Sequence, residues 1–225
     1  MALTNAQIIA RACTIAKAPG YAVQAGQYLN ILLSTLCQTY DFDFIKKTQI
    51  VPLTGAFGYD LNADNLRTKE AYYLVNGEPF YMFQIPIETY HQLFVGPGVS
   101  NYPNKFTVDV SVSPKQFLPY PPPSISQLVT IKYFPQMPDI ASPESDTGTC
   151  WFINQEYLIC KVAADVMMET DDDRQQAFEA RAEKMLLKFL DLADDKEGYA
   201  RTIKLSRERF RTTNNQNPNK AFPLG

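Results

Sequence analysis

Apolar residues recur every three to four positions at both ends of the chain, which predicts amphipathic helices there. Near the start, Thr4 and Gln7 form a capping-box pattern in front of such a run, and Pro19-Gly20 ends it. A second run, from about residue 21 to 40, places one stripe of side chains on one helix face: Ala25, Tyr28, Leu29, Leu32, Leu33, Leu36 and Tyr40. Two consecutive amphipathic helices joined by Pro-Gly predict an antiparallel helical hairpin over residues 1–43.

The pattern changes over residues 44–135, where Gly, Pro and Asn separate short runs rich in Tyr, Phe, Val and Ile. Asn76-Gly77 supplies the two positive-φ residues that a tight hairpin turn needs. Residues 128–134 predict a further strand, and residues 87–94 a short helix. Residues 119–123, Pro-Tyr-Pro-Pro-Pro, lack ladder donors and therefore predict a loop or a sheet edge. We expect this segment to be an antiparallel β-rich insertion.

Helical periodicity returns over residues 136–198, after a linker rich in Pro and Ser. Asn154 can cap the first of two helices, and the polar segment from Glu169 to Arg174 separates it from the second, which carries Phe178, Ala182, Met185, Leu186, Phe189 and Ala193. The predicted fold class is α+β. The N- and C-terminal helices form a four-helix bundle, the β-rich domain is inserted between them, and residues 199–225 form an extended tail.

The formal net charge of −3 conceals an asymmetry between this tail and the rest of the chain. Residues 199–225 contain six basic residues and one acid, Glu208, for a charge of +5, so the preceding 198 residues carry −8. A body and a tail of opposite sign can pair between copies of one chain. Such a tail can also bind an acidic partner or nucleic acid.

The sequence contains few of the residue patterns that catalytic sites use. The single histidine, His91, lies among apolar neighbours, where a packed or surface role is more common than catalysis. The four cysteines form no CxxC pair and read as buried free thiols: Cys13, Cys37, Cys150 and Cys160. Phosphate-binding glycine motifs are also missing. We therefore expect a protein that is not an enzyme and that uses no metal or cofactor.

The acidic run Asp171, Asp172 and Asp173 could suggest a divalent metal or a glycosidase site. Adjacent aspartates in a turn point in different directions, and the spacing and glycine of an EF-hand are lacking, so a solvated cluster at a helix end is the favoured interpretation. No apolar run approaches the ~20 residues of a membrane span. The N-terminus has no signal-peptide pattern, which leads us to expect synthesis in a cytoplasm.

Two features favour protein contacts. Tyrosine and phenylalanine are frequent in the β-rich segment, where alternate side chains can pack a core and the others suit an interface, with about even weight. The basic tail is too polar to form a core, yet it carries spaced apolar anchors at Ile203, Leu205, Phe210, Phe222 and Leu224. Anchors at such spacing favour a strap laid over another subunit.

At this point the chain resembles a known family. The resemblance rests on both helical ends and the start of the tail, in the segments ALTNAQIIARACTIAKAPGYAVQAGQYLNILLSTLCQTYDFDF, PQMPDIASPESDTGTCWFINQEYLICKVAADVMMETDDDR and DDKEGYARTIKLSRERF. They are similar to head-to-tail adaptor proteins of short-tailed bacteriophages, of the tail tubular protein A group. The β-rich middle matches only in character.

The resemblance implies a structural protein of the virion neck, assembled in the host cytoplasm. It would form a ring of subunits, commonly twelve, beneath the portal protein, extend the DNA channel, and meet a tail nozzle or tubular protein. The C-terminal segment would embrace the portal or an adjacent subunit, a role that falls here on Arg201, Ile203, Lys204, Leu205, Arg207, Arg209, Phe210, Arg211, Phe222 and Leu224.

A net-acidic body suits a channel through which DNA passes without binding, because acids repel phosphates. We expect the acidic faces of the last two helices, with Asp171, Asp172 and Asp173, to line that channel. Two alternatives stay open from the sequence. One is a nucleic-acid-binding module that uses the basic tail, and the other is a hydrolase with a metal at the three aspartates.

Overall fold

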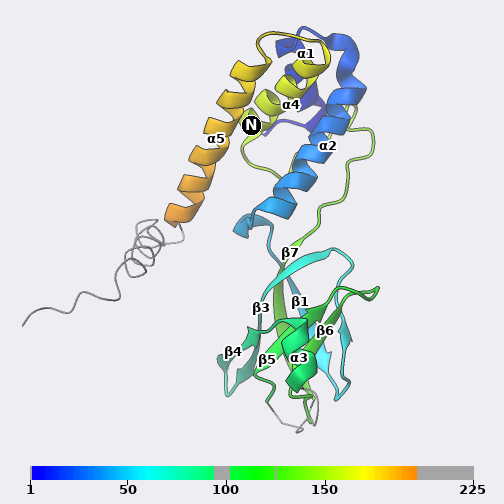
Figure 1. Ribbon diagram of the computed structural model, residues 1–225, viewed down its shortest axis with the longest axis vertical. Coiled ribbons are helices and arrows are strands. Elements are labelled where there is room, and N and C mark those ends of the chain that lie inside the picture. Colours follow the sequence, from blue (N-terminus) through cyan, green and yellow to red (C-terminus); the bar gives the residue numbers. More distant parts are fainter. Residues whose placement is uncertain (1, 94–101, 125, 197–225) are drawn as a thin grey trace, which may run out of the picture. The chain divides into compact units, whose positions relative to one another are not determined.

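Helices form both ends of the described chain and strands form its middle (Figure 1). The computed structural model describes residues 2–93, 102–124 and 126–196. The chain divides into two compact units. A helical unit comprises residues 1–29 and 142–225, and a sheet unit comprises residues 30–141. The predicted α+β class is confirmed, with five α-helices and a seven-stranded sheet in the described residues.

Two helices of the helical unit begin at capping residues that the sequence predicts. Helix α1 (Asn5–Ile15) begins at Thr4, whose hydroxyl accepts from the Gln7 amide while the Gln7 side chain accepts from the Thr4 amide. A 3₁₀ turn, η1 (Pro19–Tyr21), leads into α2 (Ala22–Thr39). Helix α4 (Gln155–Glu169) begins at Asn154, whose side chain accepts from the Tyr157 amide, and α5 (Gln175–Lys196) follows after a short turn.

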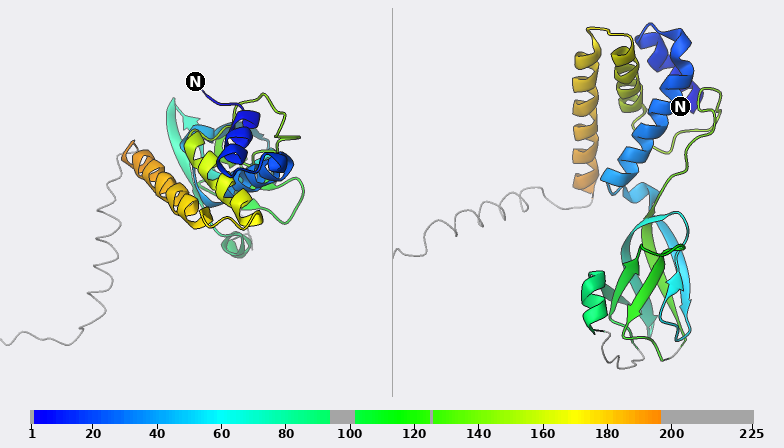
Figure 2. Two further views of the ribbon diagram at one scale, coloured as in Figure 1. Left: turned by 90° about the horizontal axis from the view of Figure 1, so that it is seen from above. Right: turned by 45° about the vertical axis from the view of Figure 1, so that its right-hand side comes forward.

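Helix α4 is the centre of the helical unit, because it packs against both α1 and α5. In Figure 2, α5 runs alongside α4 over much of its length. Phe152, Tyr157 and Met167 are buried in this unit, and most of its other core side chains are small or branched: Ile8, Ile9, Ala12, Ala25, Leu29, Leu158, Val162, Ala163, Val166 and Ala182. At Gly26 of α2 the chain comes so close to Pro143 that a Cβ would lie 2.7 Å from its Cγ. A closed four-helix bundle stays a prediction.

Segments far apart in the sequence are joined at the start of α1. The Asn5 amide donates to the Gly148 carbonyl at 2.9 Å, and the Asn5 side chain donates to the Asp146 carboxylate at 2.6 Å. The Leu3 amide donates to the Gln155 side chain at 2.9 Å. The first helix of the chain is therefore held by the segment that precedes the fourth.

The sheet unit holds seven strands: β1 (Lys47–Leu53), β2 (Tyr59–Asp60), β3 (Asn65–Val75), β4 (Glu78–Gln84), β5 (Lys105–Asp109), β6 (Gln116–Tyr120) and β7 (Gln127–Pro135). Their order is β1-β7-β3-β4-β5-β6-β2. The expected antiparallel pairing is found for all pairs but one, since β4 and β5 are parallel. The reason is that the connection through α3 (Ile87–Leu93) carries the chain back before β5 begins, as a parallel pair requires.

The turn between β3 and β4 has the predicted chemistry. Asn76 and Gly77 have φ angles of 53° and 89°, as a two-residue hairpin turn requires. Pro119 lies in β6, and β2 pairs only with Gln116 and Phe117 of that strand, so the proline stands where no described strand pairs with its outer side. The inward side chains form one core: Val51, Leu53, Leu61, Ala71, Tyr73, Met82, Phe106, Phe117, Val129 and Ile131.

Candidate functional site

The acidic run lies in the turn between α4 and α5, where the sequence places it. Helix α4 ends at Glu169, and Asp171 then takes a left-handed φ of 54°. The Asp172 amide donates back to the Met167 carbonyl at 3.0 Å, and the Asp172 carbonyl accepts from the Gln175 amide, which opens α5. Carboxylates just before a helix N-terminus are favoured by the helix dipole, so the turn is stable with its charges exposed.

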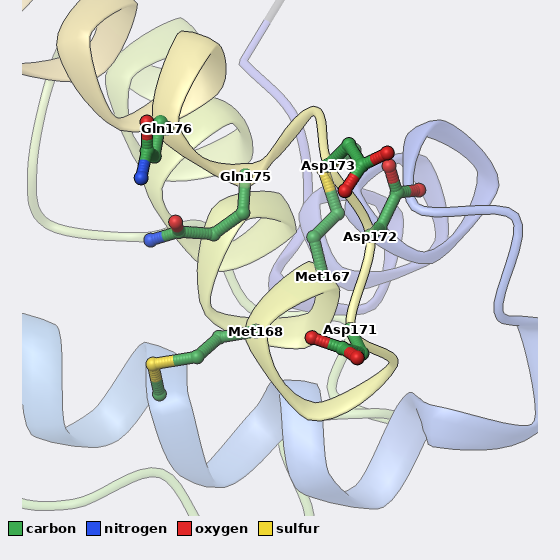
Figure 3. Close-up of a pocket in the computed structure, with 7 residues that line it drawn as sticks. All are labelled: Met167, Met168, Asp171, Asp172, Asp173, Gln175 and Gln176. Carbon is green, nitrogen blue, oxygen red and sulfur yellow. The ribbon is translucent and has the colours of Figure 1, made fainter.

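The three aspartates of this acidic turn (Asp171, Asp172 and Asp173) do not act alike. Asp172 accepts hydrogen bonds from the Arg174 amide and guanidinium, the shortest being 2.6 Å. The hydrogen bonds from Arg174 lower the pKa of Asp172 to about 2. Asp171 and Asp173 are exposed. Together with Met167, Met168, Gln175 and Gln176, these residues line a hollow of about 320 Å³. Figure 3 shows how the side chains that line it lie.

A metal reading of the turn gains no support from this geometry. Across the three described ranges, no group of three His, Cys, Asp or Glu residues stands close enough together to hold a metal ion. The nearest cation to Asp172 is the guanidinium that it already binds. The arrangement presents negative charge to solvent, which is the property that the channel hypothesis needs. Whether these acids line a channel stays a prediction.

A second feature of the helical unit is an apolar groove over α4, bordered by α1 and α5. It has a volume of about 340 Å³, with Ile15, Ile159, Phe178 and Met185 in its walls and Arg11 and Arg181 among its polar residues. The apolar residues of α5 are only partly used by the helical unit, since Ala182 is buried whereas Phe178 and Met185 are half-buried. The groove therefore leaves apolar surface accessible.

One ionic network ties α4 to α5 beside this groove. The Lys161 ammonium lies 2.6 Å from the Glu179 carboxylate and 3.2 Å from Asp165. Burial alone would lower the pKa of Lys161, but the two acids outweigh it and raise that pKa. Burial raises the pKa of Asp165, whereas the bond from Lys161 lowers the pKa of Glu179. Glu179 is therefore the main partner of Lys161, and the network is structural.

Several apolar side chains of the sheet unit are exposed among the described residues, and the sequence pattern indicated only some of them. Of five neighbouring aromatics on β3 and β4, Tyr73 is buried, Tyr72 is half-buried, and Phe80, Tyr81 and Phe83 are 42%, 50% and 72% exposed. The alternation divides them between core and surface only in part, since Phe80 is paired with the buried Tyr73 and is still exposed. Sequence reasoning missed the exposed aliphatic side chains Ile50, Leu74 and Leu128. Their exposure depends on which strands are neighbours, and that is not encoded locally.

The remaining candidates for chemistry have structural positions. His91 is exposed in the last turn of α3, with its ring against Tyr90. Cys13, Cys37 and Cys160 are buried free thiols, as predicted, and burial raises the pKa of each; Cys150 is half-buried. All ten residues of the predicted docking tail, from Arg201 to Leu224, lie outside the described residues.

Comparison with known proteins identifies the family of the chain, which the geometry alone does not. None of the helices in the described part of the chain combines the length and apolarity needed to cross a bilayer. No curated protein matches the chain. The chain does match the SU10 adaptor protein family over residues 3–205, which spans both helical ends and the whole sheet unit. The predicted relation to phage adaptors is thereby confirmed: the chain belongs to the SU10 adaptor protein family, a family of phage head–tail adaptors.

Proposed function

We propose that this chain forms a ring, of about twelve copies by resemblance to phage adaptors, that binds beneath the portal protein and connects the capsid to the tail. The observation that carries the proposal is the family match over residues 3–205. In this role the protein is a virion component that extends the DNA channel and offers its far side to a tail nozzle or tubular protein. Its work is assembly, and no turnover is required.

The charge of the body supports passage of DNA without retention. Outside the tail the chain carries −8, and Asp171 and Asp173 are exposed on the acidic turn. DNA binds proteins chiefly through cations that displace its counterions, so an acidic lining disfavours binding. If these acids face the channel, Asp171→Lys with Asp173→Lys makes assembled rings retain DNA at low salt. Rings with Asn at both positions bind none, and equal behaviour of the two variants argues against a channel position.

The basic tail is proposed to fasten the ring to the portal or to a neighbouring subunit. Its anchors and its charge are tested apart. One variant replaces Ile203, Leu205, Phe210 and Phe222 with Ser, and a matched variant replaces the arginines and lysines of residues 201–220 with Gln. A strap depends on its anchors, so the first variant loses docking at every salt concentration. The second weakens docking mainly at low salt, where charge attraction is strongest.

The direct experiment is electron microscopy of the purified chain mixed with the portal protein of the same phage. Rings of one fixed symmetry beneath the portal are expected, and their absence would refute the proposal. Deletion of residues 201–225 should abolish docking; unchanged docking would remove the tail from the mechanism. DNA affinity that falls steeply with salt and vanishes with the tail would instead favour the nucleic-acid-binding alternative.

A further inference from the structure

The apolar groove over α4 continues along α1. A second hollow, of about 400 Å³, adjoins it, since the two share Arg11, Glu156 and Ile159 in their walls. This second hollow reaches Leu3 and Gln7, so the two together accompany α1 from its first turn to its last. A groove that runs beside a helix for about three turns has the length and shape to accept another helix.

Two arginines border the groove, one on each side. Arg11 on α1 and Arg181 on α5 are exposed, and neither has an ion-pair partner among the described residues. Between them the walls include half-buried Phe178 and Met185, and Glu156 is the acid among the lining residues. Arginine next to partly exposed apolar side chains is typical of protein interfaces. The groove therefore suits a helix that presents an apolar side chain together with carboxylates.

The outer side of α5 presents such a combination. Leu187 follows Phe178 by nine residues, or about two and a half helical turns, so it points away from the groove. Leu187 is 57% exposed, and Glu183, one turn before it on the same side, is exposed as well. Asp191 lies one turn after it. Since α5 lies at an edge of the helical unit and packs mainly against α4, this outer side stays open within the described residues (Figure 2).

Lys184 and Lys188 border this outer side on one flank. They lie about 60° and 100° around the helix from Leu187, whereas Glu183 lies about 40° away in the other direction. A carboxylate is therefore the charge nearest to the leucine, and the lysines have a counterpart in Glu156 at the groove. The outer side of α5 and the arginine-bordered groove are thus complementary in charge.

The two surfaces lie on opposite sides of α5, as a ring of identical copies requires, and here the argument rests on the proposed ring. In a cyclic ring each copy contacts one neighbour with one surface and the other neighbour with a different surface. An outer α5 side that enters the groove of the next copy, repeated around the axis, closes such a ring.

The basic tail and the sheet unit are weaker candidates for the groove. The tail carries +5, and Arg11 and Arg181 repel such a charge. The exposed apolar side chains of the sheet unit lie on strands, turns and connections, apart from Ile31 on α2. Because α2 contains no charged residue, neither Ile31 nor Val23 of the same helix brings a carboxylate to the arginines.

Three other strongly exposed apolar side chains remain in the described helical unit: Ile153, Met168 and Leu192. Ile153 precedes α4 and Met168 lies in its last turn beside the acidic turn, so neither stands on a helix side that can lie along a groove. Leu192 follows Phe178 by fourteen residues, about four turns, and therefore lies on the groove's own side of α5. Leu187 is thus the exposed apolar side chain that a neighbouring copy can bring to the groove with carboxylates one turn away.

From these observations we infer that the apolar groove over α4 binds α5 of a neighbouring copy, with Leu187 in the groove and Glu183 against Arg181. A glutamate in place of Leu187 brings a charge into an apolar contact, and a glutamate in place of Arg181 faces Glu183 with like charge; both are unfavourable. Exchanging the charges at positions 181 and 183 restores opposite signs across the contact.

The test compares variants of the full chain that break or restore this contact: Leu187→Glu, Arg181→Glu, and the double exchange Arg181→Glu with Glu183→Arg. Val23→Glu is the control, because Val23 is 55% exposed on α2. All these positions are exposed, so thermal unfolding should match that of the wild type. Analytical ultracentrifugation with the portal protein of the same phage then measures two quantities. They are the concentration at which complete rings form and the affinity of single copies for excess portal.

We expect Leu187→Glu and Arg181→Glu to raise the concentration needed for ring formation by about tenfold or more. The double exchange should bring it back toward the wild-type value, and Val23→Glu should leave it unchanged. The affinity of single copies for excess portal should be the same for all variants, because no neighbouring copy takes part.

Ring formation by Leu187→Glu at the wild-type concentration would overturn the inference and leave the proposed function intact. If only Arg181→Glu failed to assemble, the groove would hold another occupant, such as the tail. Weaker binding of single copies of Leu187→Glu to excess portal would also overturn the inference, because the outer side of α5 would then contact the portal. No recovery in the double exchange would refute the contact between Glu183 and Arg181. A wild-type chain that forms no ring on the portal refutes both proposals.

Discussion

Two buried tyrosines of the sheet unit differ in what their hydroxyl groups contact. Tyr73 on β3 and Tyr133 on β7 are each 1% exposed. The Tyr133 hydroxyl donates to Asp64 at 3.0 Å and accepts from the Asn62 side chain at 2.9 Å. The Tyr73 hydroxyl has no hydrogen-bond partner within the described residues, and burial raises the pKa of Tyr73 to about 12. Removing the same oxygen from each ring should therefore change stability in opposite directions.

The magnitudes follow from these contacts. Tyr133→Phe loses two hydrogen bonds, one of them to a carboxylate, and we expect it to lower the free energy of unfolding by about 1–2 kcal/mol. This loss is small for two hydrogen bonds because Asn62 is exposed and Asp64 is half-buried, so water can replace the tyrosine hydroxyl as a partner of both. Tyr73→Phe removes an uncompensated buried hydroxyl and should raise the free energy of unfolding by about 1 kcal/mol.

The assay is urea unfolding of the full chain followed by circular dichroism, with thermal midpoints as a second readout at about 2–4 °C per kcal/mol. Tyr81→Phe is the control, since Tyr81 is 50% exposed and its loss of a hydroxyl should stay within about 0.5 kcal/mol of the wild type. Equal destabilisation by Tyr73→Phe and Tyr133→Phe would refute the reasoning, because the Tyr73 hydroxyl would then have a partner.

Two further predictions concern the helical unit. Gly26→Ala should lower the free energy of unfolding by about 1–2 kcal/mol, because the new methyl group would lie 2.7 Å from Pro143 and must displace it. Gly20→Ala is the control and should be neutral, because the space around Gly20 is open. Thermal unfolding compares the two variants, and equal effects would contradict the close approach of Gly26 to Pro143. The pKa of Asp172 should rise from about 2 toward about 3.9 in Arg174→Ala, followed by carbon-13 NMR of the carboxyl group. Because that pKa is lowered in the folded state, the stabilisation is complete above about pH 4 and is lost as the pH falls toward 2, and an unchanged pKa would show that Arg174 is not the cause.

Local chemistry made much of the fold predictable from the sequence. The caps at Thr4 and Asn154, the turn at Asn76-Gly77 and the polar break before α5 each depend on a few adjacent residues, and each is found where the pattern places it. The acidic turn was located for the same reason. The clamp of Arg174 on Asp172 was not foreseen, because it depends on the left-handed turn at Asp171.

The pairing of strands that lie far apart in the sequence could not be predicted from the local pattern of residues. Nothing adjacent to Ile50 or Leu74 indicates that β7 lies between their strands, so the exposure of these side chains could not be derived from the sequence. The parallel pairing of β4 with β5 has the same origin, since it involves only Phe83 with Lys105 and Gln84 with Phe106. Family membership, by contrast, was recognisable from continuous segments at the two helical ends, and the family match extends over residues 3–205.

The contacts that hold α1 impose a waiting time during synthesis. Asn5 and Leu3 bind Asp146 and Gln155, which lie 141 and 152 residues further along the chain. At translation rates of about 5–20 residues per second, these partners leave the ribosome roughly 7–30 s after the first helix does. Through that interval Ile8 and Ile9 have no α4 to cover them, and the sheet unit, residues 30–141, is completed only as the interval ends. The nascent chain therefore carries an uncovered apolar helix while the whole sheet unit is being made, and during this time capture by a chaperone or by another nascent chain competes with folding.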